Sequence, residues 1–156
     1  MADELPGTGE DRVGDPVAAP AATLLAPLRG QGPATMAVAL GGAVGAIARW
    51  AVGLGLPTEP GGFPLGTFLI NTVGGVAIGV LLVHLTELRS PHPLVRPFLA
   101  TGVLGGFTTF STYSVEAQHL LLGGHPLLAL AYLAGTLAAA VAATWAGVVL
   151  ARRLGR

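Results

Sequence analysis

The chain has 156 residues, of which 52% are hydrophobic and only 10% are charged, and its formal net charge is zero. Because a soluble domain carries about 25% charged residues, this composition excludes an ordinary water-facing surface and indicates an integral membrane protein. The zero net charge argues against a basic nucleic-acid-binding surface, and the absence of cysteine excludes disulfides and thiolate metal sites.

The first 33 residues differ in composition from the rest of the chain. Pro and Gly recur there, and five acidic residues fall within it: Asp3, Glu4, Glu10, Asp11 and Asp15. A signal peptide would begin with a basic region and a continuous apolar core, whereas Pro20 and Pro27 interrupt the apolar run here. We interpret residues 1–33 as a disordered tail.

The first segment long enough to cross ~30 Å of hydrocarbon covers residues 34–56. Two pairs of small residues spaced by four predict close packing against a neighbouring helix. These pairs are Gly41 with Gly45 and Gly42 with Ala46. Arg49 is the only charge of this span. It either snorkels to the interface beside Trp50, or lies in a vestibule where it attracts an anion or pairs internally.

The second span covers residues 65–88 and contains an amide, Asn71, one or two turns from its start. An unsatisfied amide in hydrocarbon is costly, so this side chain requires a partner. The partner is either a neighbouring helix or a permeating species, and the amide NH2 group is a donor that suits an anion.

The third span, residues 95–122, contains the most informative stretch of the chain. Gly105 and Gly106 each weaken a helix by roughly 1 kcal/mol relative to Ala, and five Ser or Thr residues follow within positions 108–114. Non-helical backbone at membrane depth occurs only where it is buried in protein or lines a water-filled cavity, and such breaks mark ion or substrate sites. We predict a transmembrane helix broken at its middle; the alternative is a packing face with nothing bound.

The fourth span covers residues 127–150. Tyr132, Thr136, Ala140 and Thr144 recur every four residues and share one stripe, with small residues alongside. The stripe suits a pore wall, and an Ala-rich packing helix explains it equally well.

Four spans put both termini and the second connection on one side of the membrane. The opposite connections hold no Arg or Lys. The side with the termini holds seven arginines: Arg12, Arg29, Arg89, Arg96, Arg152, Arg153 and Arg156. The positive-inside rule therefore predicts a multi-pass protein of the cell membrane with both termini in the cytoplasm.

Three stretches resemble the small fluoride channels of the Fluc/CrcB family. They read GGAVGAIAR at 41–49, GTFLINTVGG at 66–75 and GVLGGFTTFSTY at 102–113, in the family's order, and the resemblance covers residues 34–153. It implies an all-α fluoride-channel domain of four transmembrane helices that assembles as an antiparallel dimer with two fluoride pores. The implied function is passive export of fluoride from the cytoplasm, which lowers its toxicity.

The resemblance also implies site residues. A structural Na+ at the dimer centre would be held by the backbone carbonyls of Gly105 and Thr108 from both subunits, since a hard cation prefers oxygen ligands. Arg49 would lie at a vestibule. The residues implied or predicted along the fluoride pathway are Asn71, Phe110, Ser111, Thr112, Tyr113, Tyr132 and Thr136.

Two features qualify this expectation. Tyr113 stands where the family usually has Phe. The added hydroxyl bears on the conduction rate of one pore, or on whether that pore is used. The arginine bias exceeds what a homodimer of dual topology needs, so we hypothesise pairing with an oppositely oriented paralogous subunit rather than with itself.

Three other functions are compatible with a small four-helix membrane protein. A small multidrug or cation antiporter generally needs a carboxylate deep in a span, whereas Glu87 and Glu116 fall near predicted ends. An intramembrane enzyme would need a nucleophile–base pair or a metal cluster, and no such spacing emerges among the histidines. A non-conducting or half-active subunit of a heterodimeric channel stays open as the alternative.

Overall fold

The computed structural model describes residues 30–88 and 92–155, and the regular secondary structure of this part of the chain consists of helices, without strands. The predicted disordered tail lies outside the described residues except at its last four positions. Of these, Gly32 and Pro33 already belong to the first helix.

Among the described residues, three helices are long and apolar enough to cross a membrane: α2 (Gly32–Gly55), α3 (Leu65–Val83) with its π-helical continuation η2 (His84–Leu88), and α6 (Pro126–Leu154). They correspond to the predicted spans 34–56, 65–88 and 127–150 within a few residues. The predicted span 95–122 consists of shorter pieces instead: the π-helix η3 (Pro97–Leu104), α4 (Gly105–Phe107) and α5 (Ser111–Leu122).

Prolines and glycines set the ends of these helices. A proline stands in the first turn of α2, η3 and α6, where its missing N–H costs no hydrogen bond. The turn between α5 and α6 uses Gly124 at φ 82°, a conformation that glycine adopts without steric cost.

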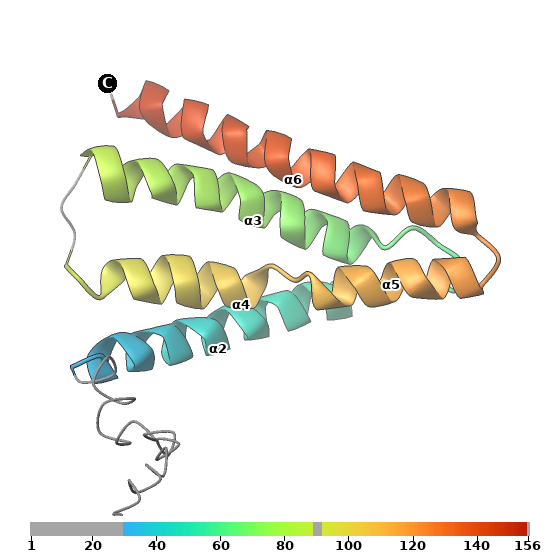
Figure 1. Cartoon of the computed structure of the whole chain (residues 1–156), viewed down its shortest axis with the longest axis horizontal. Coiled ribbons are helices and arrows are strands. Elements are labelled where there is room, and N and C mark those ends of the chain that lie inside the picture. Colours follow the sequence, from blue (N-terminus) through green and yellow to red (C-terminus); the bar gives the residue numbers. More distant parts are fainter. Residues whose placement is uncertain (1–29, 89–91, 156) are drawn as a thin grey trace, which may run out of the picture. The chain divides into compact units, whose positions relative to one another are not determined.

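The helices run alternately in opposite directions. Figure 1 shows α6 beside α3, and α2 alongside the η3–α4 rod. The start of α2, the start of η3 and the end of α6 lie at one end, and the loop 56–64 and the turn 123–125 lie at the other. Of the described arginines, Arg96, Arg152 and Arg153 belong to the first end.

Glycine permits very close backbone contact between α2 and η3. Gly41 and Gly45 are buried, and a Cβ at either would overlap a carbonyl oxygen of η3, that of Phe98 or Val103. The predicted packing face of this first span is therefore confirmed. A second close contact joins α3 to α6, where a Cβ at Gly79 would overlap the Thr144 carbonyl oxygen.

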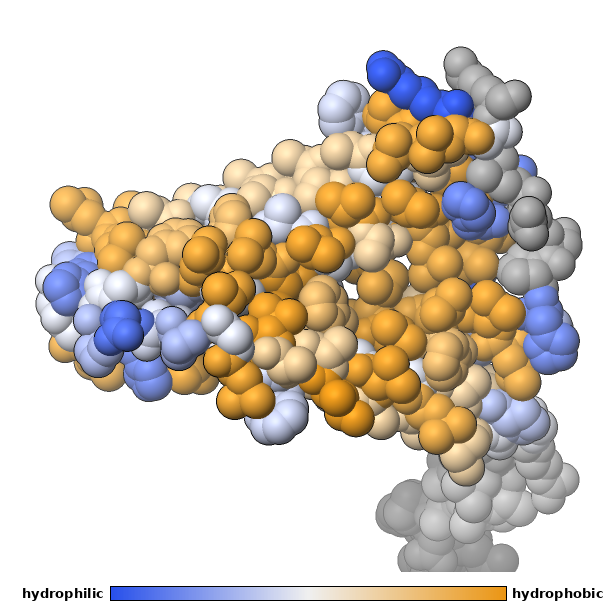
Figure 2. Space-filling view, turned by 180° about the vertical axis from the view of Figure 1, so that it is seen from behind, coloured by the Kyte–Doolittle hydropathy of each residue, from blue (hydrophilic) through white to orange (hydrophobic). Residues whose placement is uncertain are grey.

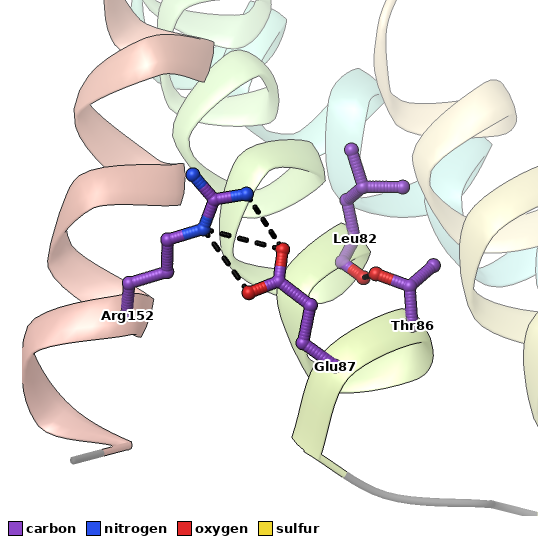
Figure 3. Close-up of polar contacts among 4 residues, drawn as sticks. All are labelled: Leu82, Thr86, Glu87 and Arg152. Carbon is purple, nitrogen blue, oxygen red and sulfur yellow. Dashed lines mark hydrogen bonds and ion pairs between the residues drawn. The ribbon is translucent and has the colours of Figure 1, made fainter.

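A bidentate ion pair joins α6 to the end of the second span. The Arg152 guanidinium donates from Nε and Nη2 to the Glu87 carboxylate at 2.6–3.2 Å (Figure 3). The two side chains are 56% and 41% exposed, and exposed pairs contribute little to stability.

The surface between the two ends is apolar. Figure 2 shows hydrophobic residues over most of the visible face, with hydrophilic residues gathered towards the two ends. On α2 the exposed side chains include Met36, Leu40, Val44, Ile47 and Leu54. Contiguous apolar surface of this kind indicates contact with lipid or with another membrane subunit.

Candidate functional site

The helical conformation of the third span stops after Phe107 and resumes at Ser111. At Thr108 the backbone is extended, with φ −73° and ψ 154°. Asn71 pairs with the backbone of the next residue, Thr109: its Nδ2 donates to the Thr109 carbonyl (3.0 Å), and its Oδ1 accepts the Thr109 N–H (2.9 Å). The amide thus substitutes for a neighbouring peptide group. Its partner was expected to be either a neighbouring helix or a permeating species, and in the structure it is the neighbouring span.

The interruption changes the hydrogen bonding of two carbonyl groups. In a continuous α-helix the Thr109 N–H would bond the Gly105 carbonyl, but here it bonds Asn71. Likewise the Thr112 N–H, the ordinary partner of the Thr108 carbonyl, donates to Thr109 Oγ1 at 3.1 Å. Both carbonyl oxygens are therefore released from their helical donors. An added Cβ at Gly105 would meet nothing within 4 Å.

The Thr109 side chain organises the start of α5. Its hydroxyl accepts the Thr112 N–H, as an N-cap side chain does, donates to Thr112 Oγ1 (3.1 Å), and lies 3.3 Å from Ser111 Oγ. Thr109 is only 8% exposed. The sequence did not identify Thr109 as a site residue, because it resembles the neighbouring hydroxyl residues. Only its contact with Asn71 in the structure distinguishes it.

Arg49 approaches the same interruption from α2. Its Nε donates to the Gly106 carbonyl at 3.1 Å, so it pairs internally. It also lines a cavity of about 910 Å³, called here the Arg49 cavity, whose polar lining includes Thr67, Thr109, Thr112, Glu116 and His119. The vestibule role of Arg49 stays a prediction.

Glu116 takes part in a network that the sequence did not reveal. Its Oε1 accepts the Thr67 hydroxyl (3.0 Å) and its Oε2 accepts the Tyr132 hydroxyl (2.7 Å). Thr67 is 5% exposed and Tyr132 is fully buried. Glu116 lies in the middle of α5 (Ser111–Leu122), and this helix ends where the third span was predicted to end.

A second cavity, called here the Phe110 cavity, measures about 400 Å³ and is lined by residues of α3, of α6 and of the interruption itself. Thr109 lines both cavities. The Phe110 side chain is 78% exposed, whereas Thr136 is buried and its Oγ1 has no hydrogen-bond partner among the described residues. The predicted site residues that line this cavity are Asn71, Thr108, Phe110, Tyr113 and Thr136.

A chain of aromatic rings begins at the Phe110 cavity. Phe110, Tyr113 and Tyr132 form consecutive contacts with centroid separations of 5.8 and 5.3 Å, and Tyr132 continues to Phe63 at 5.4 Å. These are ordinary distances for attractive ring pairs. The structure thus brings the predicted residues around one interruption; Tyr132 is enclosed and bonded to Glu116, while Thr136, Ala140 and Thr144 of its stripe line the Phe110 cavity.

The sequence of residues 36–148 matches the family described as CrcB-like protein, Camphor Resistance (CrcB). The chain belongs to the CrcB family. Curated relatives are named fluoride-specific ion channels. FluC 1 of Streptomyces coelicolor is 53% identical over 126 residues, which are 81% of this chain and 82% of the relative. FluC 2 of Streptomyces avermitilis is 57% identical over 108 residues, 69% and 68% of the two chains. FluC of Hydrogenobaculum sp. is 45% identical over 101 residues, 65% and 83% of the two chains.

Membership of the CrcB family, together with the three long apolar helices, establishes a multi-pass membrane protein. The matched range includes Arg49, Asn71, the interruption and the α6 stripe, so the whole candidate site lies within the CrcB domain.

Proposed function

We propose that this chain is a subunit of a fluoride-specific ion channel that lets F− leave the cytoplasm down its gradient. The observation that supports this most is the interruption of the third span, where Asn71 bonds the Thr109 backbone beside two cavities. The chain belongs to the CrcB family, and its relatives are named fluoride-specific ion channels.

The path we propose runs from the Arg49 cavity to the Phe110 cavity past Thr109, which lines both. The Arg49 charge draws anions into the first cavity. Fluoride is strongly hydrated, so a pore must replace its water without holding the ion too tightly. The donors for this are hydroxyl and amide groups and the electropositive edges of aromatic rings: Asn71, Phe110, Ser111, Thr112, Tyr113 and Thr136. Tyr132 contributes through Glu116 rather than as a free hydroxyl.

The protomer leaves the Phe110 cavity open, which supports assembly as an antiparallel dimer. Phe110 is 78% exposed and would be covered by the partner. The released carbonyls of Gly105 and Thr108 are hard oxygen donors and fit a Na+ ion. Two subunits related by a two-fold axis would supply four such ligands. When bound, the ion would supply a fixed positive charge that favours an anion nearby; it would be structural and not transported.

The arginine bias favours a single orientation, with both termini in the cytoplasm. An antiparallel dimer of such chains requires an oppositely oriented subunit, which supports a paralogous partner over a second copy of this chain. A tagged-terminus accessibility assay that found both orientations equally populated would instead support the homodimer.

Growth in fluoride tests the proposed function in cells. A bacterial strain without fluoride channels should regain growth in fluoride medium when it expresses this chain, alone or with an oppositely oriented paralogue. Unchanged fluoride sensitivity in both cases, with the protein present in the membrane, would contradict the proposal. Rescue only by the pair would identify a subunit that cannot conduct alone.

A further inference from the structure

An apolar groove, called here the α3–η3 groove, runs between the second and third spans. It measures about 740 Å³ and is lined by side chains of α3, η2 and η3, of which only His84 is polar. Along the second span the lining extends from Val73 to His84, a length of about 16 Å at 1.5 Å per residue. Because the hydrocarbon core is ~30 Å thick, the groove has the length of the acyl region of one leaflet.

The α3–η3 groove faces away from the proposed subunit interface. Val73, Val80 and His84 line the groove, whereas Asn71 and Ile78 line the Phe110 cavity. At 3.6 residues per turn, these two sets of residues lie on opposite sides of the second span. A partner subunit that covers the Phe110 cavity therefore leaves the groove to the membrane, which favours lipid over a second subunit as its occupant.

Basic residues gather where the groove reaches the arginine-bearing end of the subunit, which is predicted to be cytoplasmic. The one described carboxylate of this end, Glu87, is paired with Arg152. Arg96 is exposed, directly follows the groove residue Val95, and has no ion pair among the described residues. Basic sites between membrane helices on the cytoplasmic side bind anionic lipid headgroups. Arg96 thus offers an unpaired guanidinium to a phosphate at this end of the groove.

We propose that the α3–η3 groove binds one anionic phospholipid of the cytoplasmic leaflet, with an acyl chain between α3 and η3 and the phosphate at Arg96. In the subunit α2 packs on η3, and α3 packs on α6. The acyl chain would lie between these two helix pairs and join them. This inference uses only the membrane setting and the groove, so it holds whether or not the chain conducts fluoride.

Native mass spectrometry of the delipidated full-length protein tests the headgroup, with added phosphatidylglycerol or phosphatidylcholine of the same acyl chains. The wild type should bind phosphatidylglycerol about 5-fold more tightly, the factor expected for one basic residue at an anionic lipid surface. Arg96→Gln should remove this preference and still bind phosphatidylcholine. Arg153→Gln, which removes the same charge from α6, is the matched control and should keep the preference; equal losses in the two variants would overturn the assignment of the headgroup to Arg96.

Filling the groove tests the acyl-chain site in the same measurement. Ala77 lines the groove, so Ala77→Leu should remove most bound lipid of either kind. Ala142→Leu makes the same change on the exposed surface of α6 and should bind lipid like the wild type. If Ala77→Leu does not fold, Val80→Phe fills the same wall of the groove and replaces it.

Two results would overturn the acyl-chain site. Wild-type lipid binding by the folded groove variant would place the lipid elsewhere on the protein. Loss of the dimer mass, with lipid binding retained, would identify a second subunit as the occupant of the groove. A failure of fluoride efflux would leave this inference intact, because none of these measurements depends on conduction.

Discussion

Replacing Asn71 with Ala removes both hydrogen bonds that hold the third span open at Thr109. Thr109 is 8% exposed, so its N–H and C=O cannot turn to water. Leaving a buried polar group unpaired costs about 1–3 kcal/mol, which gives about 2–6 kcal/mol for two. Hydrogen bonds between membrane helices average nearer 0.6 kcal/mol, or about 1 kcal/mol for the pair.

The lower part of this range is expected, because the Thr109 N–H has an alternative partner. If the interruption closes into continuous helix, that N–H bonds the Gly105 carbonyl again. The free energy of unfolding should then fall by only about 1–2 kcal/mol. Fluoride efflux should nevertheless be lost, because closure removes a carbonyl proposed to bind Na+ and turns the pathway residues of α5.

The assay is thermal stability of the purified protein together with fluoride efflux from proteoliposomes. Thr72→Val is the matched control: the neighbouring hydroxyl bonds only the Phe68 carbonyl of its own helix, at 2.7 Å, so both properties should stay near wild type. Wild-type efflux from folded Asn71→Ala would refute the reasoning that this amide maintains the conducting backbone.

Three further predictions concern packing, assembly and the ion pair. Gly45→Ala would overlap the Val103 carbonyl, whereas Gly53→Ala would meet nothing within 4 Å, so only the first should lower thermal stability, and equal melting temperatures would contradict the packing described. An added Cβ at Gly105 also has no neighbours within 4 Å, so Gly105→Ala should leave the subunit folded but reduce the dimer fraction in cross-linking. Gly106→Ala would overlap Gly42 and should impair folding. An unaltered dimer fraction for Gly105→Ala would place the subunit interface elsewhere. Arg152→Gln breaks the exposed pair with Glu87 and should change neither thermal stability nor fluoride efflux measurably; a large loss of either would show that the pair does more than join two helix ends.

The sequence was informative where a single residue type has few acceptable environments. Apolar length placed the long helices within a few residues, and glycines spaced by four identified the face of α2 that packs on η3. Asn71 could be recognised as a residue in need of a partner, because an unpaired amide is costly in a membrane. Glycines beside hydroxyl residues predicted a break in the third span, where the structure has α4 ending at Phe107 and α5 beginning at Ser111.

The sequence could not identify contacts that depend on the placement of distant backbone. Asn71 bonds the main chain of Thr109, 38 positions away. Because every residue has a main-chain carbonyl, the sequence does not indicate which one the amide will bond. The bond from the Tyr113 hydroxyl to the Leu133 carbonyl is hidden for the same reason. Glu116 was expected near a helix end, and its bonds to Thr67 and Tyr132 depend on the packing of three helices, which the sequence does not show.

The most direct test of the central claim is passive ion efflux from proteoliposomes, measured with a fluoride electrode and a chloride electrode. The chain is reconstituted alone and together with an oppositely oriented paralogue from the same cell. The account predicts fast efflux of fluoride without chloride in at least one of the two preparations. If folded protein in both released fluoride no faster than chloride, or no faster than empty liposomes, the chain would not be a subunit of a fluoride-specific channel.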